Sequence, residues 1–286
     1  MNQKSAGNLP DMSGRTIAFI GAGNMAGSLI GGLVADGYNA ARIYASDIDG
    51  EKLASLSARF GTRSASDNFD AVKRSDVVVL AVKPQAIEMV VNDLAEAIQH
   101  YRPLVISIAA GVREAHLRKW LGSGVALIRA MPNTPAMLQA GATVLHAGVG
   151  ITQQQKSIAE TILRSVGLTC WVKDEALMDA VTALSGSGPA YFFLVMEAME
   201  QAGTELGLPA GTARLLTLQT ALGAARMAME SSEGPATLRS YVTSPGGTTE
   251  SALKTLEAGG IRNIFRQALI AAKERSEALS AMLGNS

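Results

Sequence analysis

Short apolar runs alternate with longer stretches of helical pattern over residues 14–172. The apolar runs read TIAFIG, RIYAS, VVVLAV, LVISIA and ALIRAM, in that order. Short apolar strands separated by helices are typical of βαβ units, in which helices cover both faces of a parallel sheet. We therefore predict an α/β domain with a parallel sheet over residues 14–172.

The strand pattern ends after Trp171, and only helical patterns follow. We predict helices over residues 175–184, 188–206, 209–231, 247–257 and 261–283. The second domain, over residues 173–286, is therefore expected to be all-α.

One predicted helix is apolar around most of its circumference. Residues 212–229 read TARLLTLQTALGAARMAM, with Arg214, Gln219 and Arg226 as the large polar residues. A helix that is apolar on all sides must be buried on all sides. A small helical domain has few helices to surround it, so we expect a second subunit to supply part of the cover. A central helix in a compact bundle is the alternative.

Composition and charge narrow the classes of function. The chain of 286 residues is 48% hydrophobic, and its 25 basic residues balance 25 acidic ones. A globular protein without net charge has no overall field to attract nucleic acid or an anionic membrane, so we expect a small-molecule ligand. The first 13 residues do not resemble a signal peptide, and we expect no membrane segment.

Cysteine and histidine usage points to the cytoplasm and away from metal chemistry. The one cysteine, Cys170, excludes an internal disulfide and indicates a reducing, cytoplasmic setting. It lies in an apolar strand, LTCWV, so we expect it to be packed and inert. His100, His116 and His146 lack the spacing of metal ligands, and we expect surface or capping roles for them and no bound metal.

A glycine motif follows the first strand. In TIAFIGAGNMAGSLI, Gly21, Gly23 and Ala26 form G-x-G-x-x-A between a strand and a helix. The first glycine permits a tight turn, the second lets the backbone approach a pyrophosphate, and the small third residue lets helix pack on strand. The positive helix end then meets the phosphates. We predict a Rossmann-like dinucleotide-binding domain, with a glycine-rich structural turn as the alternative.

The end of the second strand leaves the choice of dinucleotide open. Asp47 stands where an acid ordinarily holds a ribose 2'-hydroxyl, which favours NAD. Ser46 can instead donate to a 2'-phosphate, with Lys52 reaching back towards it, while Asp47 points to solvent or caps the next helix. Both readings stand at this point.

Three further loops follow strands, and therefore meet at the carboxyl edge of the sheet, where ligands of open α/β sheets bind. They read LAVKPQ, SIAAG and MPNTP. The small residues of SIAAG allow a flat ring to lie close to the backbone, or else serve helix packing.

A second glycine-rich turn, SPGGTTE at residues 244–250, lies between two helical patterns. Gly246 and Gly247 remove side chains so that N–H groups can face an anion, and the helix that begins near Thr248 adds its positive end. We predict that this turn binds substrate. A helix start capped by a hydroxyl is the structural alternative.

Taken in order, GAGNMA, AVKPQ, SIAAG, MPNTP, LSGSGPAYFF and SPGGTTE resemble the pyrroline-5-carboxylate reductase family, from about Arg15 to about Ala278. The resemblance implies a Rossmann-like dinucleotide-binding domain followed by an all-α dimerisation domain. It also implies hydride transfer from NADPH, sometimes NADH, to the C=N bond of 1-pyrroline-5-carboxylate, which gives L-proline in the last step of its biosynthesis. The implied assembly is a homodimer, often as a decamer of five dimers.

The matching motifs assign site residues by resemblance. Thr249 would bond the ring nitrogen as the catalytic residue. Glu175, Gly247 and Thr248 would also meet substrate. Cofactor contacts are predicted at Gly21, Ala22, Gly23, Asn24, Met25, Ser46, Asn68, Ala81, Val82, Lys83, Pro84 and Ala110. Asp47 departs from a pattern that would favour a phosphate, and a plain role for Glu175 is that of an acid in the first turn of a helix.

Two assignments stay open within LSGSGPAYFF. Its small residues either pack near the nicotinamide or substrate or serve structure alone. We expect the aromatic run at residues 191–193 to pack in the core.

Two rival functions are weaker. A β-hydroxyacid dehydrogenase needs a lysine on an early helix of the second domain, and residues 188–206 contain none. A non-catalytic nucleotide sensor does not need a second anion-binding turn.

Overall fold

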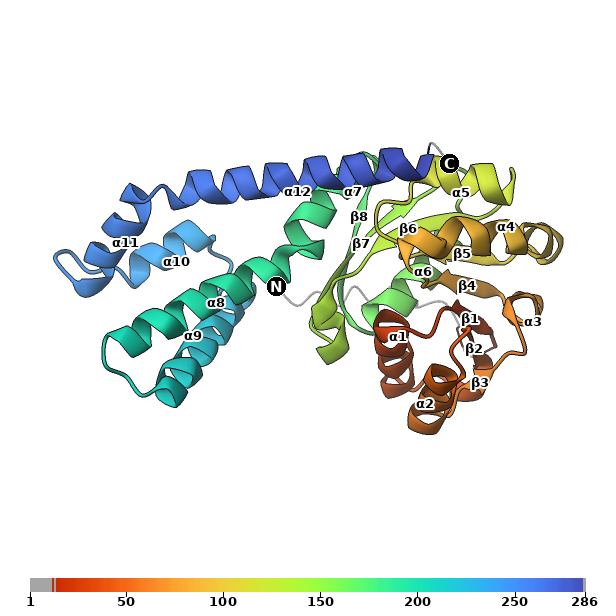
Figure 1. The fold of residues 1–286 in the computed structure, drawn as a ribbon, viewed down its shortest axis with the longest axis horizontal. Helices are drawn as coiled ribbons and strands as arrows, with labels where there is room; N and C mark the ends of the chain where they lie inside the picture. Colours follow the sequence, from red (N-terminus) through yellow and green to blue (C-terminus); the bar gives the residue numbers. More distant parts are fainter. Residues whose placement is uncertain (1–11, 13, 285–286) are drawn as a thin grey trace. The chain divides into compact units, whose positions relative to one another are not determined.

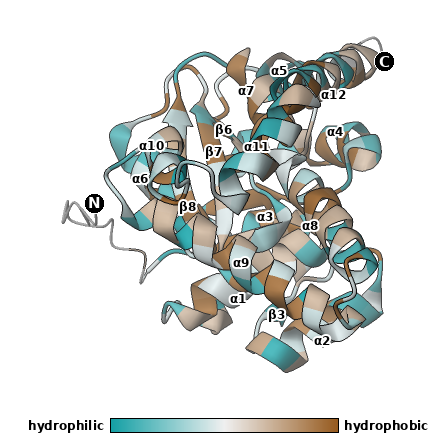
Figure 2. Ribbon diagram, turned by 90° about the vertical axis from the view of Figure 1, so that its left-hand side faces the viewer, coloured by the Kyte–Doolittle hydropathy of each residue, from teal (hydrophilic) through white to brown (hydrophobic). Residues whose placement is uncertain are grey.

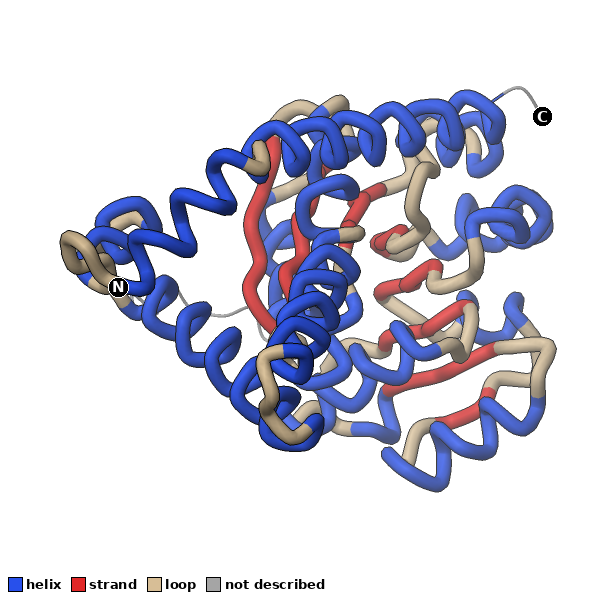
Figure 3. The backbone as a smooth tube through the Cα atoms, turned by 60° about the vertical axis from the view of Figure 1, so that its left-hand side comes forward, coloured by secondary structure: helices blue, strands red, loops and turns tan. Residues whose placement is uncertain are grey.

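The computed structural model describes residue 12 and residues 14–284, and its main feature is an 8-stranded sheet ordered β3-β2-β1-β4-β5-β6-β7-β8. The strands are β1 (Ile17–Ile20), β2 (Ile43–Ser46), β3 (Arg63–Ser64), β4 (Val77–Leu80), β5 (Leu104–Ser107), β6 (Leu127–Met131), β7 (Gly141–Ala147) and β8 (Gly167–Val172). All paired strands are parallel except β6 and β7, which are antiparallel. Figure 3 shows the strands in red with helices around them.

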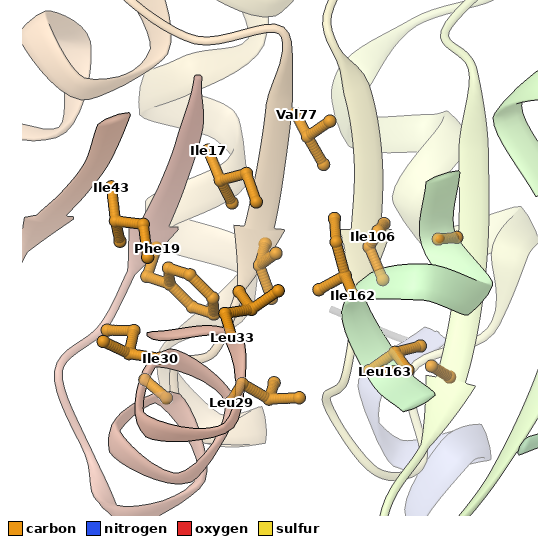
Figure 4. Close-up of a cluster of buried hydrophobic side chains, with 14 of the residues drawn as sticks. Ile17, Phe19, Leu29, Ile30, Leu33, Ile43, Val77, Ile106, Ile162 and Leu163 are labelled. Atoms are coloured by element: carbon orange, nitrogen blue, oxygen red, sulfur yellow. The ribbon is translucent and has the colours of Figure 1, made fainter. Parts of the chain in front are cut away.

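Helices cover both faces of the sheet. One face carries α1 (Asn24–Ala35), α2 (Gly50–Phe60) and α6 (Gln153–Arg164), and the other carries α3 (Asn68–Lys73), α4 (Pro84–Tyr101) and α5 (Glu114–Leu121). In β1, Ile17 and Phe19 join the first core, whereas Ala18 and Ile20 join the second, because successive strand residues point to opposite faces. Figure 4 shows the first core. Burial on both faces explains why these strands are apolar throughout.

Local signals fix several helix ends. Asp49 accepts hydrogen bonds from the N–H groups of Glu51 and Lys52 at the start of α2. That helix ends at Gly61, which is in the left-handed conformation with φ 75°. α6 begins with a capping box between Thr152 and Gln155.

The C-terminal part of the chain is helical, as Figure 1 shows. Its elements are α7 (Leu177–Val181), a π-helical turn (Thr182–Gly186), α8 (Gly188–Glu205), α9 (Ala210–Glu230), α10 (Pro235–Tyr241), α11 (Thr248–Ala258) and α12 (Ile261–Gly284). The four longest predicted helices are confirmed to within about two residues at their ends. The predicted helix at 175–184 is a short α-helix followed by the π-helical turn, and α10 was not predicted.

The chain divides into two compact units after Ser187. We call residues 14–187 with 272–284 the sheet unit, and Gly188–Ala271 the helical unit. α12 therefore belongs in part to each. The predicted boundary between residues 172 and 173 stays a prediction; by these contacts, residues 173–187 belong with the sheet.

Within the helical unit, α8 and α9 form an antiparallel pair (Figure 1). They approach closely where Gly203 faces Ala213, since a Cβ built on Gly203 would lie 3.3 Å from the Cβ of Ala213. Of α9, only Ala213 and Thr217 are buried, and Leu215 is 68% exposed. Figure 2 shows hydrophobic positions in brown and tan along α8 and α9. The apolar circumference predicted for residues 212–229 is thus largely uncovered within one chain.

Three expectations about packing are wrong for this chain. Cys170 is exposed rather than packed, because it lies on the open face of β8, which also carries the 63% exposed Leu168. Phe192 and Phe193 are 68% and 64% exposed rather than in a core. His146 is not a surface group: it lies in β7, is 8% exposed, and its Nε2 is 3.5 Å from Glu114 Oε2.

The described helices include none whose length and apolar content would suffice to cross a membrane.

Candidate active site

The turn at residues 21–25, which we call the N-terminal glycine turn, is tightly constrained. Gly21 has φ +101°, and a Cβ built on it would lie 2.7 Å from the Ala81 carbonyl oxygen. Its N–H donates to the Ser46 carbonyl oxygen at 2.8 Å. Gly23 is the N-cap residue of α1, and a Cβ there would meet nothing within 4 Å. Gly21 must therefore be glycine for fit, while Gly23 leaves open space at a helix N-terminus that suits a pyrophosphate.

The carboxylate of Asp47 is bonded to backbone N–H groups of two other residues. Its Oδ2 accepts from the Ala22 N–H at 2.6 Å, and its Oδ1 accepts from the Asp49 N–H at 2.9 Å. Both carboxylate oxygens thus have a backbone donor. The sequence left Asp47 as a ribose ligand, a solvent group or a helix cap, whereas in the structure it ties the N-terminal glycine turn to the segment after β2.

Ser46 and Asn68, two predicted cofactor contacts, meet beside this turn. The Ser46 hydroxyl donates to Asn68 Oδ1 at 2.7 Å, and Ser46 is buried. Lys52 lies 3.1 Å from Asp49 Oδ2, and its pKa is raised by that hydrogen bond first and by the charges of Asp49 and Asp47 after it. The ammonium of Lys52 is therefore paired with Asp49.

The predicted loops do meet at the carboxyl edge of the sheet. The Ala81 N–H donates to the Ile20 carbonyl oxygen at 2.8 Å, and the Ile108 N–H donates to that of Leu80 at 3.2 Å. Pro84 is in the first turn of α4, whose N-cap residue is Lys83.

Two cavities adjoin these loops in the sheet unit. One, of about 350 Å³, extends from Ala22, Gly23 and Asn24 along α1 and α2. The other, of about 570 Å³, is lined by Pro84, Ala110, the π-helical turn and α12. Predicted cofactor contacts therefore border both cavities.

The MPNTP loop is bonded to the LSGSG segment. Asn133 donates through Nδ2 to the Ser185 carbonyl oxygen at 3.0 Å and accepts at Oδ1 from the Ala142 N–H at 2.8 Å. A Cβ on Gly186 would lie 2.5 Å from the terminal carbon of Met131. Two motifs that the sequence analysis treated separately thus form one structure, and the second adopts the π-helical turn, a form frequent at functional sites.

Glu175 has a partner that the sequence analysis missed. Its Oε1 accepts from Arg129 Nη1 and from the Glu114 N–H, each at 2.5 Å. Arg129 lies in β6 and is buried. The available signal was a single arginine inside the apolar strand ALIRAM. The pKa of nearby His116 is lowered, by burial first and then by the charges of Arg113 and Arg129.

The turn at residues 244–249, which we call the C-terminal glycine turn, lies in the helical unit. α11 begins at Thr248 after the N-cap residue Gly247, which has no side chain to cap the helix. Gly246 has φ +72°, and its N–H donates to Glu250 Oε2 at 2.8 Å. The Gly247 N–H donates to the Ser244 carbonyl oxygen at 3.0 Å. We expected these two N–H groups to face the substrate, but in the structure both donate to acceptors within the chain.

The predicted site residues fall into two groups. The sheet unit contains Glu175 and all the predicted cofactor contacts, and the helical unit contains Gly247, Thr248 and Thr249 together at the start of α11. Among the described residues, no cluster of three or more His, Cys, Asp or Glu side chains is placed to hold a metal ion.

A glycine turn beside the carboxyl ends of parallel strands fits a dinucleotide, and the profile that matches this part of the chain gives the class of protein, an NAD(P)-dependent oxidoreductase. A sequence profile described as NADP oxidoreductase coenzyme F420-dependent matches residues 16–111. A second, described as pyrroline-5-carboxylate reductase dimerisation, matches residues 175–279. The chain belongs to the pyrroline-5-carboxylate reductase family, as its full-length relatives show.

Those relatives agree in sequence and in fold. The pyrroline-5-carboxylate reductase of Pseudomonas aeruginosa is 52% identical over 96% of this chain and 100% of that protein. The solved structure of the Coxiella burnetii reductase is 48% identical, with a TM-score of 0.89 over 93% of this chain and 98% of that one. The Plasmodium falciparum reductase, solved with NADP bound, is 28% identical, with a TM-score of 0.84 over 94% of this chain and 99% of that one. The predicted family and fold class are confirmed.

Proposed function

We propose that this protein transfers hydride from NAD(P)H to the C=N bond of 1-pyrroline-5-carboxylate and so forms L-proline, the last step of proline biosynthesis. The observation that carries the proposal is the 52% identity to a pyrroline-5-carboxylate reductase along 96% of the chain. Both halves of the chain support it, because an oxidoreductase profile matches the first and the family's dimerisation profile matches the second.

The residues of the N-terminal glycine turn fit a dinucleotide, which supplies the hydride when bound. Residues 21–25 would hold the pyrophosphate at the start of α1, where Gly23 leaves open space. Ala81, Val82, Lys83, Pro84 and Ala110 would border the ring. We propose that NADPH is preferred, since Asp47 is bonded to backbone N–H groups, and the hydroxyl of Ser46 holds Asn68 by its Oδ1 so that the amide Nδ2 would donate to a 2'-phosphate.

The C-terminal glycine turn would bind the substrate through its carboxylate. The first N–H groups of a helix have no partner within the helix, and those of α11 begin at Thr248, next to an N-cap residue without a side chain. An anion is stabilised there by these donors and by the helix dipole. Gly247 and Thr248 would line this anion site, and Thr249 would hydrogen-bond the ring nitrogen.

The proposed hydride transfer does not require a general acid or base from the protein. We propose that the imine binds already protonated, in which case the site would mainly position donor and acceptor carbons. Glu175 would be the carboxylate that faces the substrate cation, held in orientation by Arg129.

The chain carries the dimerisation domain of its family. We propose a homodimer formed through α8 and α9, whose exposed leucines and phenylalanines need cover, and a decamer of five such dimers. The lone cysteine supports a cytoplasmic location.

The proposed role of Thr249 is tested by Thr249→Ala, with Thr255→Ala on the exposed part of the same helix as control. We expect Thr249→Ala to lower kcat/KM for pyrroline-5-carboxylate at least tenfold and the control to change it less than twofold. A loss smaller than about threefold, or about 0.7 kcal/mol of transition-state stabilisation, would remove the role of Thr249.

The reaction itself is tested by following NAD(P)H absorbance with pyrroline-5-carboxylate and, separately, with a 3-hydroxy acid and NAD(P)⁺. Oxidation of NAD(P)H by the imine alone supports the reductase. Turnover of the hydroxy acid instead would favour the dehydrogenase, and no turnover with either would favour a sensor.

A further inference from the structure

The carboxylate of Glu250 is seated on the C-terminal glycine turn. Its Oε2 accepts from the Gly246 N–H at 2.8 Å, and its Oε1 lies 3.3 Å from Lys254 Nζ. Glu250 is the third residue of α11. In an ordinary capping box, a Glu at this position bonds the N–H of the N-cap residue. Here it reaches one residue further back, to the residue before the N-cap.

This bond divides the N–H groups of the turn into two sets. Gly246 donates to Glu250, and Gly247 donates to the Ser244 carbonyl oxygen at 3.0 Å. The next N–H groups along the chain belong to Thr248 and Thr249, which open α11 and follow a cap without a side chain. The donors that would be left for an anion are therefore the N–H groups of Thr248 and Thr249.

The glycine pair is the part of this turn that needs restraint. Gly246 is left-handed, with φ +72°, and a Cβ there would meet nothing within 4 Å. The Cβ side of Gly246 is therefore open, and glycine has the most backbone freedom to lose on ordering. The hydrogen bond to Glu250 ties its N–H to the rigid first turn of α11.

We propose that Glu250 is a positioning residue for the substrate carboxylate. By holding the Gly246 N–H, it fixes the turn so that the first N–H groups of α11 stay open and aligned for the anion. The inference rests on the proposed role of the C-terminal glycine turn in binding pyrroline-5-carboxylate. Without the bond, the substrate itself has to order the turn, and that ordering cost appears as weaker binding.

The acceptor oxygen of Glu250, rather than its charge, carries this role. A glutamine keeps an acceptor oxygen on a side chain of the same length, whereas an alanine removes it. The charge is not needed near a substrate that is itself a carboxylate. The matched control is Glu257→Ala, which makes the same change further along α11, where Glu257 pairs with Arg262 and Arg239 away from the turn.

The experiment compares steady-state kinetics of the full-length oligomer for Glu250→Ala, Glu250→Gln and Glu257→Ala. For Glu250→Ala we expect KM for pyrroline-5-carboxylate to rise about tenfold, or about 1.4 kcal/mol, with kcat and KM for NADPH within twofold. Glu250→Gln restores KM to within threefold of the parent value, and Glu257→Ala leaves it unchanged. A loss of folded protein would lower kcat and leave KM alone, so KM decides even if Glu250→Ala is less stable.

Three results overturn the proposal: KM for the imine within twofold of the parent in Glu250→Ala, no recovery in Glu250→Gln, or an equal rise in KM for NADPH. The Thr249→Ala experiment separates this failure from a wider one. If Thr249→Ala is damaging while Glu250→Ala is neutral, the turn still binds substrate and only the role of Glu250 falls. If both are neutral, the assignment of substrate to this turn falls with it.

Discussion

The two glycine turns are both restrained by an acidic side chain, but from different distances along the chain. Each precedes a helix whose N-cap is a glycine, Gly23 for α1 and Gly247 for α11, and in each an acidic side chain holds one backbone N–H. In the N-terminal turn the acid is Asp47, 25 residues away in sequence from the Ala22 that it binds. In the C-terminal turn it is Glu250, only 4 residues from Gly246.

This difference separates a turn built by tertiary structure from one built locally. The N-terminal turn exists only when β1, β2 and β4 are paired, because Ser46 and Ala81 then surround Gly21. The C-terminal turn needs only the first turn of α11. Glycines that look alike in the sequence therefore differ in how much tertiary structure surrounds them.

The largest effect should come from adding one carbon to each turn. Gly21→Ala puts a Cβ 2.7 Å from the Ala81 carbonyl oxygen and strains a residue whose φ is +101°. We therefore expect the free energy of unfolding to fall by about 2–4 kcal/mol and NADPH binding to become unmeasurable. Gly246→Ala meets only the strain at φ +72°, about 1 kcal/mol. Urea unfolding at matched protein concentration measures the free energy of unfolding of both variants. Equal losses would contradict the distinction between the turns.

Substitution of Asp47 should have the second-largest effect, which is weaker binding of both cofactors. Asp47→Ala leaves the Ala22 N–H without its acceptor, and we expect KM to rise about tenfold, or 1.4 kcal/mol, for NADPH and NADH alike. Asp47→Asn keeps one acceptor oxygen and should raise KM less than about threefold. Initial rates with each cofactor measure this. If Asp47 instead bound the ribose 2'-hydroxyl, the alanine variant would weaken the binding of NADH alone.

Ser46 should give the smallest and most selective change. Ser46→Ala removes the hydroxyl that donates to Asn68 Oδ1 and holds that amide in place, so we expect kcat/KM for NADPH to fall about fivefold, or about 1 kcal/mol, and that for NADH to change less than twofold. Ser57→Ala, on the exposed part of α2, is the matched control and should leave kcat/KM unchanged with both cofactors. A parallel fall with both cofactors would assign Ser46 to the turn rather than to the 2'-phosphate.

The sequence was sufficient for elements whose residue pattern has one physical cause. β1, β4 and β5 are buried on both faces and read as continuous apolar runs, and the long C-terminal helices end near their predicted positions. β7 was missed because GATVLHA mixes polar and apolar residues, and its antiparallel pairing with β6 breaks the βαβ repeat. α10 is short and begins with proline, a pattern that reads equally well as a loop.

The residues of the candidate site stay a prediction, and the bonds between them were not predicted. Motifs placed the cofactor loops on one edge of the sheet, yet nothing in the order of residues says that Asp47 binds Ala22 or that Arg129 binds Glu175. Such pairs join residues far apart in the chain and depend on strand order. The bond of Glu250 to Gly246 is local, but the spacing of a capping box would have indicated the N–H of Gly247 instead.

The ion pair between Arg129 and Glu175 bears on how this chain can be recombined with its relatives. Arg129 is buried in β6, while Glu175 comes just before α7. A chimaera joined after residue 172 takes the partner of that guanidinium from the other parent, and a parent without an acid at that position would leave a buried cation unmatched, which is strongly destabilising. Crossing over after Ser187 keeps both partners in one parental segment.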